Sequence, residues 1–232
     1  MTTIAILGRS GRMGRAIAEA AAERGILLTD APDVFIDFSA PAALANNLER
    51  AVGSGHPIVI GTTGLDEQQH RLIDEAAGEI PVLHAANMSL GVNILAHLVR
   101  QTAARLGTDW DIEIVETHHR HKVDAPSGTA LLLGQAAARG RGADLARVRS
   151  ASDRSGARRE GEIGFAVLRG GSVAGDHQIV FAGTGERIEL GHRAESRAIF
   201  AEGAIRAALW LADRPAGRYS MDDVLGLTDD LA

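Results

Sequence analysis

Residues 4–14, IAILGRSGRMG, place a short apolar run directly before glycines at positions 8, 11 and 14. From Met13 to Arg24 apolar residues recur at helical spacing, and Gly25 follows as a C-terminal glycine would. Strand, glycine turn and helix in this order are a variant of the dinucleotide fingerprint, because glycines let the backbone approach a pyrophosphate at the helix N-terminus. We therefore expect cofactor contacts along the turn, at Gly8, Arg9, Ser10, Gly11, Arg12 and Met13. A tight turn that binds no ligand is the alternative.

Beyond this turn, short apolar runs alternate with helical patterns through roughly the first 88 residues. We expect further strands at Val34–Phe38, Pro57–Ile60 and Pro81–Leu83, and further helices at Pro41–Val52 and Asp66–Ala77. Continuous apolar runs separated by helices predict a parallel sheet that is covered on both faces. The fold class is therefore α/β, with a Rossmann-type nucleotide domain.

One part of this nucleotide domain is shortened. Only residues 30–33 separate the apolar run Ile26–Thr29 from Val34, whereas parallel neighbours need a crossover of a dozen or so residues. Either one strand is lost or the two runs pair in an unusual way. The acidic residue that normally ends the second strand and binds the adenosine ribose has only Asp30 and Asp33 as weak candidates. The sequence therefore does not choose between NADH and NADPH.

The pattern changes after residue 88. We expect helices at Gly91–Leu106, Thr129–Arg139 and Ser196–Ala212, strands at Asp111–Glu116, Ile163–Leu168, Gln178–Phe181 and Arg187–Leu190, and mostly surface loop over Arg139–Glu162. Strands in a row without intervening helices indicate an antiparallel or mixed sheet. We expect a dinucleotide-binding domain of residues 1–88 plus 199–232, to which the last helix returns, and a smaller α+β domain of residues 89–198.

Composition limits the classes of function. The 232 residues carry a formal net charge of −6 at pH 7, and only 3% are aromatic. This argues against a nucleic-acid binder, which usually has a basic face and stacking aromatics. The lack of cysteine excludes disulfides, thiolate metal ligands and cysteine nucleophiles. No signal peptide precedes the first strand and no apolar run approaches the roughly 18 residues of a membrane span, so we expect a cytoplasmic protein without a membrane partner.

The stretch EIVETHHRHKVDAPSGTA, residues 113–130, points to chemistry. It groups five basic residues, His118, His119, Arg120, His121 and Lys122, shortly before a helix-like run. Basic side chains beside a helix N-terminus indicate a site for a small molecule with several negative charges, and histidine also moves protons near neutral pH. Neighbouring side chains on an extended segment point to opposite faces, so the five do not all converge on one ligand. His-His-x-His without cysteine is a poor zinc template, so we expect no metal.

These residues resemble the signature of the 4-hydroxy-tetrahydrodipicolinate reductase family, also called dihydrodipicolinate reductases. The resemblance covers nearly the whole chain, with GRSGRMG at 8–14, VFIDFSAP at 34–41, VIGTTG at 59–64, AANMSLGVN at 85–93 and FAGTGERIELGHRAESRAIFAEGAIRAALWL at 181–211. It implies a Rossmann-type domain that includes the C-terminal helix, and a substrate domain whose sheet builds a homotetramer. It also implies hydride transfer from NADH or NADPH to a cyclic, conjugated imine with two carboxylates, giving tetrahydrodipicolinate in diaminopimelate and lysine biosynthesis.

The resemblance also assigns roles to residues of the candidate substrate site. His118 matches the proton donor or acceptor beside the reacting ring, and His119 matches a substrate contact. Lys122 matches a residue that binds one substrate carboxylate and is a second candidate proton donor. The loop that binds the other carboxylate through backbone N–H groups and a hydroxyl is matched by Ser127, Gly128 and Thr129. Ser127 also has the position of a helix cap, which uses the same geometry.

Two further turns match cofactor loops of the family. Gly61, Thr62 and Thr63 match the turn for the nicotinamide half, with Thr62 also near the substrate, and Ala85, Ala86, Asn87 and Met88 match another cofactor loop. Arg120 and His121 are expected to be supporting residues, and Arg193 and Arg197 are weaker candidates for positive charge in the substrate pocket. The chain departs from the family where it lacks several tens of residues between the first helix and VFIDF, a segment that touches cofactor choice.

Two other functions are compatible with such a fold. A related two-domain dehydrogenase would act on another small dicarboxylate or amino acid, and activity with the cyclic substrate separates it from the reductase. A nucleotide-sensing module would use the same fold to report redox state, since fold alone does not set function. A sensor would carry a DNA-binding helix pair or a partner-binding extension, and neither is visible in the sequence.

Overall fold

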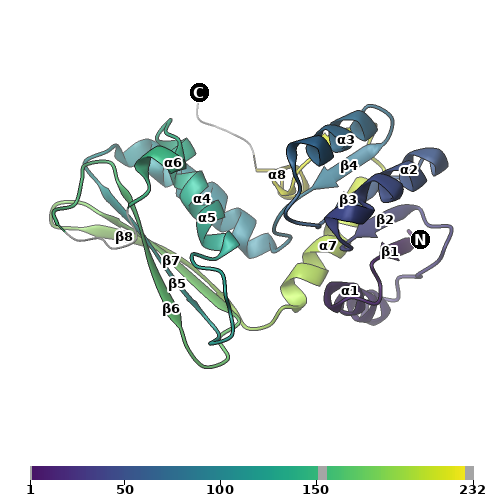
Figure 1. Ribbon diagram of the computed structural model, residues 1–232, viewed down its shortest axis with the longest axis horizontal. Helices are drawn as coiled ribbons and strands as arrows, with labels where there is room; N and C mark the ends of the chain where they lie inside the picture. Colours follow the sequence, from purple (N-terminus) through teal and green to yellow (C-terminus); the bar gives the residue numbers. More distant parts are fainter. Residues whose placement is uncertain (1, 151–155, 228–232) are drawn as a thin grey trace. The chain divides into compact units, whose positions relative to one another are not determined.

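The computed structural model describes residues 2–150 and 156–227 and divides into two compact units (Figure 1). The first unit runs up to Leu90 and resumes at Ala198, and the second spans Gly91–Arg197. Each unit has its own sheet and its own hydrophobic core. Within the described ranges, no helix has the length and apolar character needed to cross a membrane.

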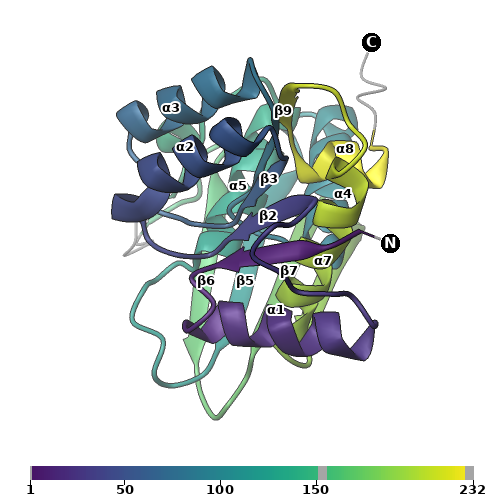
Figure 2. The ribbon, with the colours of Figure 1, turned by 90° about the vertical axis from the view of Figure 1, so that its right-hand side faces the viewer.

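The first unit is built on a parallel sheet with the strand order β1-β2-β3-β4-β9. Its strands are β1 (Ile4–Leu7), β2 (Val34–Asp37), β3 (Ile58–Ile60), β4 (Pro81–His84) and β9 (Gly217–Tyr219). Its helices are α1 (Arg12–Glu23), the 3-10 turn η1 (Pro41–Ala43), α2 (Leu44–Ser54), α3 (Glu67–Ala77), α7 (Ala198–Leu211) and α8 (Met221–Leu225). Figure 2 shows α2 and α3 over one face of the sheet and α1 and α7 over the other, which matches the two hydrophobic clusters. The expected α/β class and Rossmann-type sheet are confirmed.

The amino end of β1 explains how the shortened segment is accommodated. Ile4 forms an isolated parallel bridge with Leu28 on one side and pairs with Val34 of β2 on the other. The chain between them turns around the start of β1, where Asp33 accepts hydrogen bonds from the Thr3 N–H at 2.7 Å and the Thr3 hydroxyl at 2.9 Å. The two runs do not pair with each other, because β1 lies between them. The loss of one strand is therefore the alternative that the structure adopts, and the run Ile26–Thr29 keeps only a single bridge to β1.

The second unit holds a mixed sheet with the strand order β6-β5-β7-β8. Its strands are β5 (Asp111–His118), β6 (Ile163–Arg169), β7 (Gly175–Ala182) and β8 (Arg187–Ala194), and its helices are α4 (Leu90–Leu106), α5 (Gly128–Gly140) and α6 (Leu145–Val148). β5 pairs in parallel with β6 and antiparallel with β7, and β7 pairs antiparallel with β8. Residues of α4 and α5 form one core with the sheet. The expectation of an antiparallel or mixed sheet is confirmed in its mixed form.

Several elements differ from the sequence expectations. The predicted loop Arg139–Glu162 contains α6, whose four residues are too few to show a periodicity, although Asp144 caps it by accepting from the Ala146 N–H at 3.0 Å. β9 and α8, beyond the last predicted helix, were missed for the same reason. β5 continues to His118 rather than ending at Glu116, because His118 pairs with Arg169 of β6 in the sheet register. This extension brings the first predicted catalytic residue onto a strand.

Candidate active site

Strand β5 alternates between the two faces of its sheet and supplies the first pair of site residues. His118 is the last residue of the strand, and both His118 and Glu116 are buried on the face that packs against α5, with Glu116 only 1% exposed. His118 Nδ1 lies 2.5 Å from Glu116 Oε2. An ionised carboxylate only accepts hydrogen bonds, so Nδ1 carries a proton and Nε2 is the ring nitrogen available for proton transfer.

Both oxygens of the Glu116 carboxylate are held by donors from other segments. Arg169, at the end of β6, donates from Nη1 to Oε2 at 2.7 Å and from Nη2 to Oε1 at 2.9 Å. The backbone N–H of Ser127 donates to Oε1 at 2.9 Å. Burial would raise the pKa of Glu116, but the hydrogen bonds from Arg169, His118 and Ser127 outweigh burial and hold the pKa below its ordinary value. The carboxylate is therefore ionised at neutral pH.

Ser127 links this carboxylate to a second buried histidine. It caps α5, because its Oγ accepts from the Ala130 N–H at 3.1 Å, and the same hydroxyl lies 3.1 Å from His177 Nε2. His177 lies on β7 opposite Glu116, and its ring packs edge-on against His118 with centroids 5.0 Å apart. Burial first, and then the neighbouring His118, lower the pKa of His177 to about 4. His177 is therefore neutral near pH 7, and we assign the Ser127 O–H as donor to its Nε2.

Lys122 follows β5 and is connected to the same carboxylate through the main chain. Its Nζ lies 2.9 Å from Asp124 Oδ1, and the hydrogen bond from Lys122 lowers the pKa of the Asp124 carboxyl. The carbonyl oxygen of Asp124 accepts from Arg169 Nη2 at 2.7 Å. Gly128 and Thr129 form the first turn of α5, one residue earlier than the sequence predicted. The Glu116–Arg169 ion pair thus has hydrogen bonds to His118, to the segment that carries Lys122 and to the start of α5.

The other basic residues predicted for this site have no side-chain hydrogen bond to Glu116, Arg169 or Ser127 among the described residues. His119 Nε2 lies 3.1 Å from Arg197 Nη2, and burial together with that positive charge lowers the pKa of His119. Arg120 and His121 are exposed. Arg193 is exposed and lies opposite Asp176 in the register of β7 and β8. Of the two weaker arginine candidates, Arg197 is the one that contacts a predicted site residue.

The sequence predictions missed Glu116, Arg169 and His177 of the hydrogen-bonded group, and also Asp124. Glu116 could have been found, because it stands two residues before His118 and a strand places such residues on the same face. Arg169 and His177 reach the site only through the pairing of β6 and β7 with β5. Their registers depend on tertiary structure, so no local pattern identifies them.

In the first unit, the glycine turn between β1 and α1 has the geometry of a pyrophosphate site. Gly8 has a φ of +81°, and a Cβ on Gly14 would lie 2.4 Å from the Gly8 carbonyl oxygen, so neither position tolerates a side chain. α1 begins after Gly11 without a side-chain cap, which leaves first-turn N–H groups for a ligand. Arg9 and Arg12 are exposed beside this turn. The residues therefore fit the phosphates of a dinucleotide.

The other predicted cofactor loops follow β3 and β4 at the same edge of the parallel sheet. Gly61, Thr62 and Thr63 follow β3, and Ala85, Ala86, Asn87 and Met88 follow β4. Thr62 is 5% exposed, and its Oγ1 is buried without a hydrogen-bond partner among the described residues. The same holds for Oδ2 of Asp37 at the end of β2. Thr62 lies in the first unit, unlike the other predicted substrate residues.

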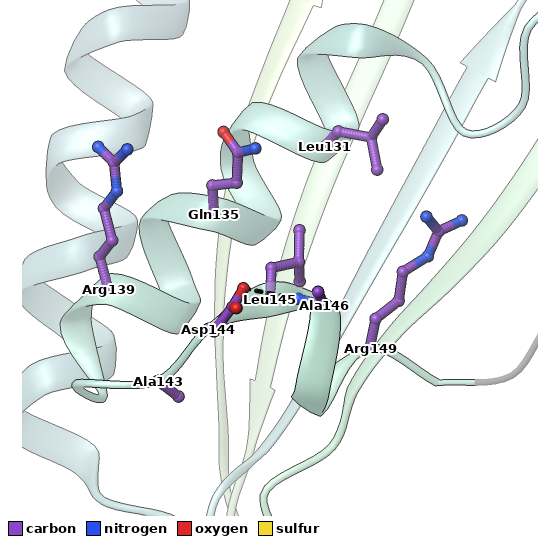
Figure 3. A pocket seen from close by; sticks show the side chains of 8 residues that line it. All are labelled: Leu131, Gln135, Arg139, Ala143, Asp144, Leu145, Ala146 and Arg149. Carbon is purple, nitrogen blue, oxygen red and sulfur yellow. Dashed lines mark hydrogen bonds between the residues drawn. The ribbon is translucent and has the colours of Figure 1, made fainter.

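A pocket elsewhere in the second unit contains none of the predicted residues. It lies between α5 and α6 and is lined by Leu131, Gln135, Arg139, Asp144, Leu145 and Arg149, among others (Figure 3). Its long polar side chains come from the exposed surfaces of the two helices. Across the described residues, no group of three or more histidine, aspartate or glutamate side chains is arranged to hold a metal ion.

Comparison with protein families gives two matches that together cover most of the chain. Residues 91–225 match the family described as dihydrodipicolinate reductase, C-terminus. Residues 25–88 match the family described as dihydrodipicolinate reductase, N-terminus. The second match begins after the glycine turn and the first helix, where the shortened segment begins.

Individual relatives agree with these matches. A 4-hydroxy-tetrahydrodipicolinate reductase of Zymomonas mobilis is 59% identical over 250 aligned residues, which cover 97% of this chain and 97% of that protein. One from Pseudoalteromonas translucida is 45% identical over 262 residues, covering 97% of this chain and 98% of that protein. Both alignments are longer than the 232 residues of this chain, as a deletion requires. Among solved structures, a dipicolinate-bound dihydrodipicolinate reductase from Paenisporosarcina sp. TG-14 has a TM-score of 0.75 at 21% identity, covers 95% of this chain and 97% of its own, and shows the same fold.

Proposed function

The chain belongs to the dihydrodipicolinate reductase family, and on this premise we propose roles for its two units and for the residues of its candidate site. It catalyses the pyridine-nucleotide-dependent reduction of 4-hydroxy-tetrahydrodipicolinate to tetrahydrodipicolinate, a step of diaminopimelate and lysine biosynthesis. The observation that carries this conclusion is the identity of 59% to a relative of that name over nearly the full length of both chains.

We assign nucleotide binding to residues 1–88 and 199–232, and substrate binding to residues 89–198. The uncapped start of α1 and the tight turn at Gly8 and Gly14 support the first assignment, since both suit a pyrophosphate. NADH or NADPH supplies the hydride when bound there. Thr62 and the residues that follow β4 would hold the nicotinamide half at the carboxyl edge of the sheet.

The substrate carries two carboxylates, and the second unit offers two kinds of anion partner. Lys122 presents an ammonium group with three donors, of which Asp124 takes one. The N–H groups of Gly128 and Thr129 stand at the start of α5, where the helix dipole favours negative charge. We propose that Lys122 binds one carboxylate, that Ser127, Gly128 and Thr129 bind the other, and that His119 makes a further substrate contact.

We propose that His118 is the proton donor of the reaction. Hydride addition to the conjugated imine leaves an enamine-like carbon that must take a proton, and a histidine side chain suits this step because it is the commonest general acid and base in enzymes. The proton leaves from His118 Nε2, because Nδ1 is engaged by Glu116. Solvent then restores the proton, so the residue is unchanged after each turnover.

The shortened segment bears on the choice between the two cofactors. Asp33, one of the two weak ribose candidates, is engaged by Thr3 at the amino end of β1, whereas the phosphate turn lies at its carboxyl end. Asp33 is therefore not placed to bind the 2′-hydroxyl or to repel a 2′-phosphate. We propose that the enzyme uses both NADH and NADPH.

We also propose that the enzyme is a cytoplasmic homotetramer assembled through the mixed sheet. One face of this sheet packs against α4 and α5, whereas the other face presents residues such as Val115, Ala166 and Leu168 that no helix of the second unit covers (Figure 1). A half-apolar open sheet face needs a partner layer. Sedimentation at four times the mass of the 24.4 kDa chain would support the tetramer, and a monomer at working concentration would exclude it.

The decisive test is NAD(P)H oxidation with enzymatically generated substrate, comparing the two nucleotides side by side and using His118→Ala as the inactive control. Turnover with both nucleotides is the expected result, and a tenfold preference for one would overturn the proposal of dual use. Calorimetry with pyridine-2,6-dicarboxylate, a flat substrate mimic, should show binding in the presence of cofactor. A protein that binds nucleotide but turns over with neither would contradict the reductase assignment.

A further inference from the structure

The feature that the proposed reaction leaves unexplained is the Glu116 carboxylate. It is 1% exposed, and a buried charge is costly unless its partners replace the lost water. Its partners are unusually complete: two guanidinium N–H groups of Arg169, one backbone N–H of Ser127 and one imidazole N–H of His118. An apolar residue at this core position would cost less, which points to a role other than stability.

We propose that Glu116, held by Arg169, is a positioning residue that fixes the tautomer and orientation of His118. This inference rests on the proposed function of His118 as the proton donor. Glu116 and His118 stand two residues apart on β5 and therefore share one face of the sheet, with Arg169 opposite His118 on the neighbouring strand β6. The carboxylate keeps the proton on Nδ1, so Nε2 is the nitrogen that gives its proton to the substrate carbon.

The guanidinium of Arg169 extends this control to the other substrate residues. Its Nη2 also donates to the carbonyl oxygen of Asp124, whose side chain pairs with Lys122. On the other side of Glu116, the N–H of Ser127 fixes the residue that caps α5. One Glu–Arg pair thereby sets the relative positions of the proton donor, the carboxylate-binding lysine and the anion-binding helix start. Such preorganisation matters because small errors in the position of a reacting group are costly to rate.

The protons on His118 and Glu116 can be followed through one turnover. A protonated His118 has two donors, of which Nδ1–H is satisfied by Glu116 and Nε2–H is the one left for the proposed transfer. When Nε2 gives its proton to the substrate carbon, His118 becomes neutral with its remaining proton on Nδ1. Glu116 stays ionised throughout, because Arg169 remains in place, and it neither gives nor takes a proton. The carboxylate therefore acts only through His118.

The substitution Glu116→Gln separates this role from simple packing, because the amide keeps the shape and has only one acceptor oxygen. Arg169 and the Ser127 N–H both require that oxygen, so the amide NH₂ group turns toward His118. His118 Nδ1 must then accept, which moves the proton of the neutral ring to Nε2 and leaves the cationic ring with a donor facing a donor. The matched control is Glu113→Gln on the same strand, where Glu113 pairs with Arg158 on the opposite face of the sheet.

The experiment combines kinetics with nitrogen NMR of histidine-labelled protein. We expect Glu116→Gln to lower kcat by roughly 100-fold or more, as loss of the orienting carboxylate does in a catalytic triad, with KM for the substrate changed less than about threefold. The neutral His118 ring should change from the Nδ1–H to the Nε2–H tautomer. Glu113→Gln should keep wild-type kcat and tautomer. An unchanged His118 tautomer in Glu116→Gln, or an equal loss of kcat in both variants, would overturn the proposal.

Two further measurements test the positioning role of Glu116 if Glu116→Gln does not fold. If Glu116→Gln does not fold, Glu116→Asp retains the charge at a greater distance, and it should fold, keep the Nδ1–H tautomer and lose less kcat. Loss of the Nδ1–H tautomer in that variant would contradict the role assigned to the carboxylate. The tautomer of the wild-type protein is measured without any substrate. A wild-type enzyme that lacks reductase turnover would therefore contradict the proposed function, whereas an Nε2–H tautomer in the wild type would contradict the positioning role alone.

Discussion

The end of β5 and the carboxyl edge of the parallel sheet in the first unit both carry buried polar atoms. The two regions differ in whether those atoms have hydrogen-bond partners within the protein. At the end of β5, each oxygen of Glu116 and the capping hydroxyl of Ser127 has protein partners. At the sheet edge of the first unit, Thr62 Oγ1 and Asp37 Oδ2 have no hydrogen-bond partner in the described part of the chain. The carboxylate at the end of β5 is thus satisfied by the protein itself, although the nearby His177 Nδ1 has no partner among the described residues. At the sheet edge, we propose that the two unpartnered atoms are available to a ligand.

This difference follows from the two tasks that we propose. A group that transfers a proton must have a fixed tautomer and direction before the substrate arrives, so its surroundings are charged side chains with complete hydrogen bonds. A dinucleotide is held along its length by backbone N–H groups and glycine contacts, which require close approach rather than charge. Substitutions that damage one region should therefore spare the ligand of the other.

The largest expected effect comes from removing the proposed reacting groups of the second unit. His118→Ala should lower kcat by about 10²–10⁴-fold, the usual contribution of a positioned acid–base group. Lys122→Ala should also lower turnover by orders of magnitude, because a substrate carboxylate loses the ammonium group that positions it. Nucleotide affinity should be nearly unchanged in both variants, because the proposed nucleotide residues lie in the first unit. Steady-state kinetics and a fluorescence titration with NADH measure the two quantities. The exposed neighbour His121→Ala is the matched control and should keep wild-type kcat.

A large loss of NADH affinity in His118→Ala or Lys122→Ala would contradict the division of labour between the two units. Equal losses of turnover in His121→Ala would show that the histidine cluster acts through its charge rather than through one oriented ring. Retained turnover in Lys122→Ala would instead assign carboxylate binding to the start of α5 alone.

The opposite result is expected for Gly14→Ala in the first unit. The added Cβ would lie 2.4 Å from the Gly8 carbonyl oxygen and 2.6 Å from Arg9 Cα, so the turn itself must shift. Strain of about 1–3 kcal/mol corresponds to a loss of nucleotide affinity of roughly tenfold to a hundredfold. Calorimetry should show weaker NADH binding. Gly53→Ala in α2 is the control, because its Cβ meets nothing within 4 Å, and wild-type affinity in Gly14→Ala would exclude a close-packed phosphate turn.

The fold was largely predictable because its strands are continuous apolar runs. Ile4–Leu7 appears with the predicted ends, and Val34–Asp37 is one residue shorter than predicted, since short apolar runs bounded by turn residues favour strands of a parallel sheet. α6 and β9 were missed because three or four residues carry no periodicity. The pairing of Leu28 with Ile4 remained undecided in the sequence, because it depends on a turn around the free start of β1.

The candidate site was predicted in its basic residues and missed in its acidic one. His118, Lys122 and Ser127 were found because their types and spacing indicate anion binding and proton transfer. Glu116 carries a charge that repels anions, so the basic pattern does not indicate it, and only Arg169 on another strand compensates that charge. Roles for all of these residues stay predictions, but their joint hydrogen bonding is a property of the fold.

A smaller effect concerns stability, through the neutral His177. Its folded pKa of about 4 lies below the ordinary value of 6.5, so the unfolded chain binds this proton first as the pH falls. The contribution of His177 to the free energy of unfolding is therefore fully present above about pH 6.5. It decreases by about 3 kcal/mol as the pH falls to about 4. Urea unfolding at pH 7 and at pH 4.5 should differ less in His177→Gln than in the wild type.

Glu116 affects the stability of the protein over a different, more acidic pH range. The pKa of Glu116 is depressed below 4.5, so its contribution is present above that value and is lost only as the pH falls further. Direct titration of the His177 ring by NMR should give a midpoint near 4. A midpoint near 6.5 would show that the ring is hydrated and that its contact with Ser127 is not maintained in solution.

The smallest effect is expected at Asp33 in the first unit. Asp33 accepts from Thr3 at the start of β1, and the four residues of β1 span roughly 10–13 Å before the phosphate turn is reached. A carboxylate at the amino end of the strand is too far away to bind a ribose at its carboxyl end. Asp33→Asn should therefore leave the NADH/NADPH ratio of kcat/KM within about twofold, less than the roughly 1.4 kcal/mol of a tenfold change. A tenfold shift toward NADPH would mean that Asp33 reads the ribose, and the nucleotide region would then rely on an oriented charge as the end of β5 does.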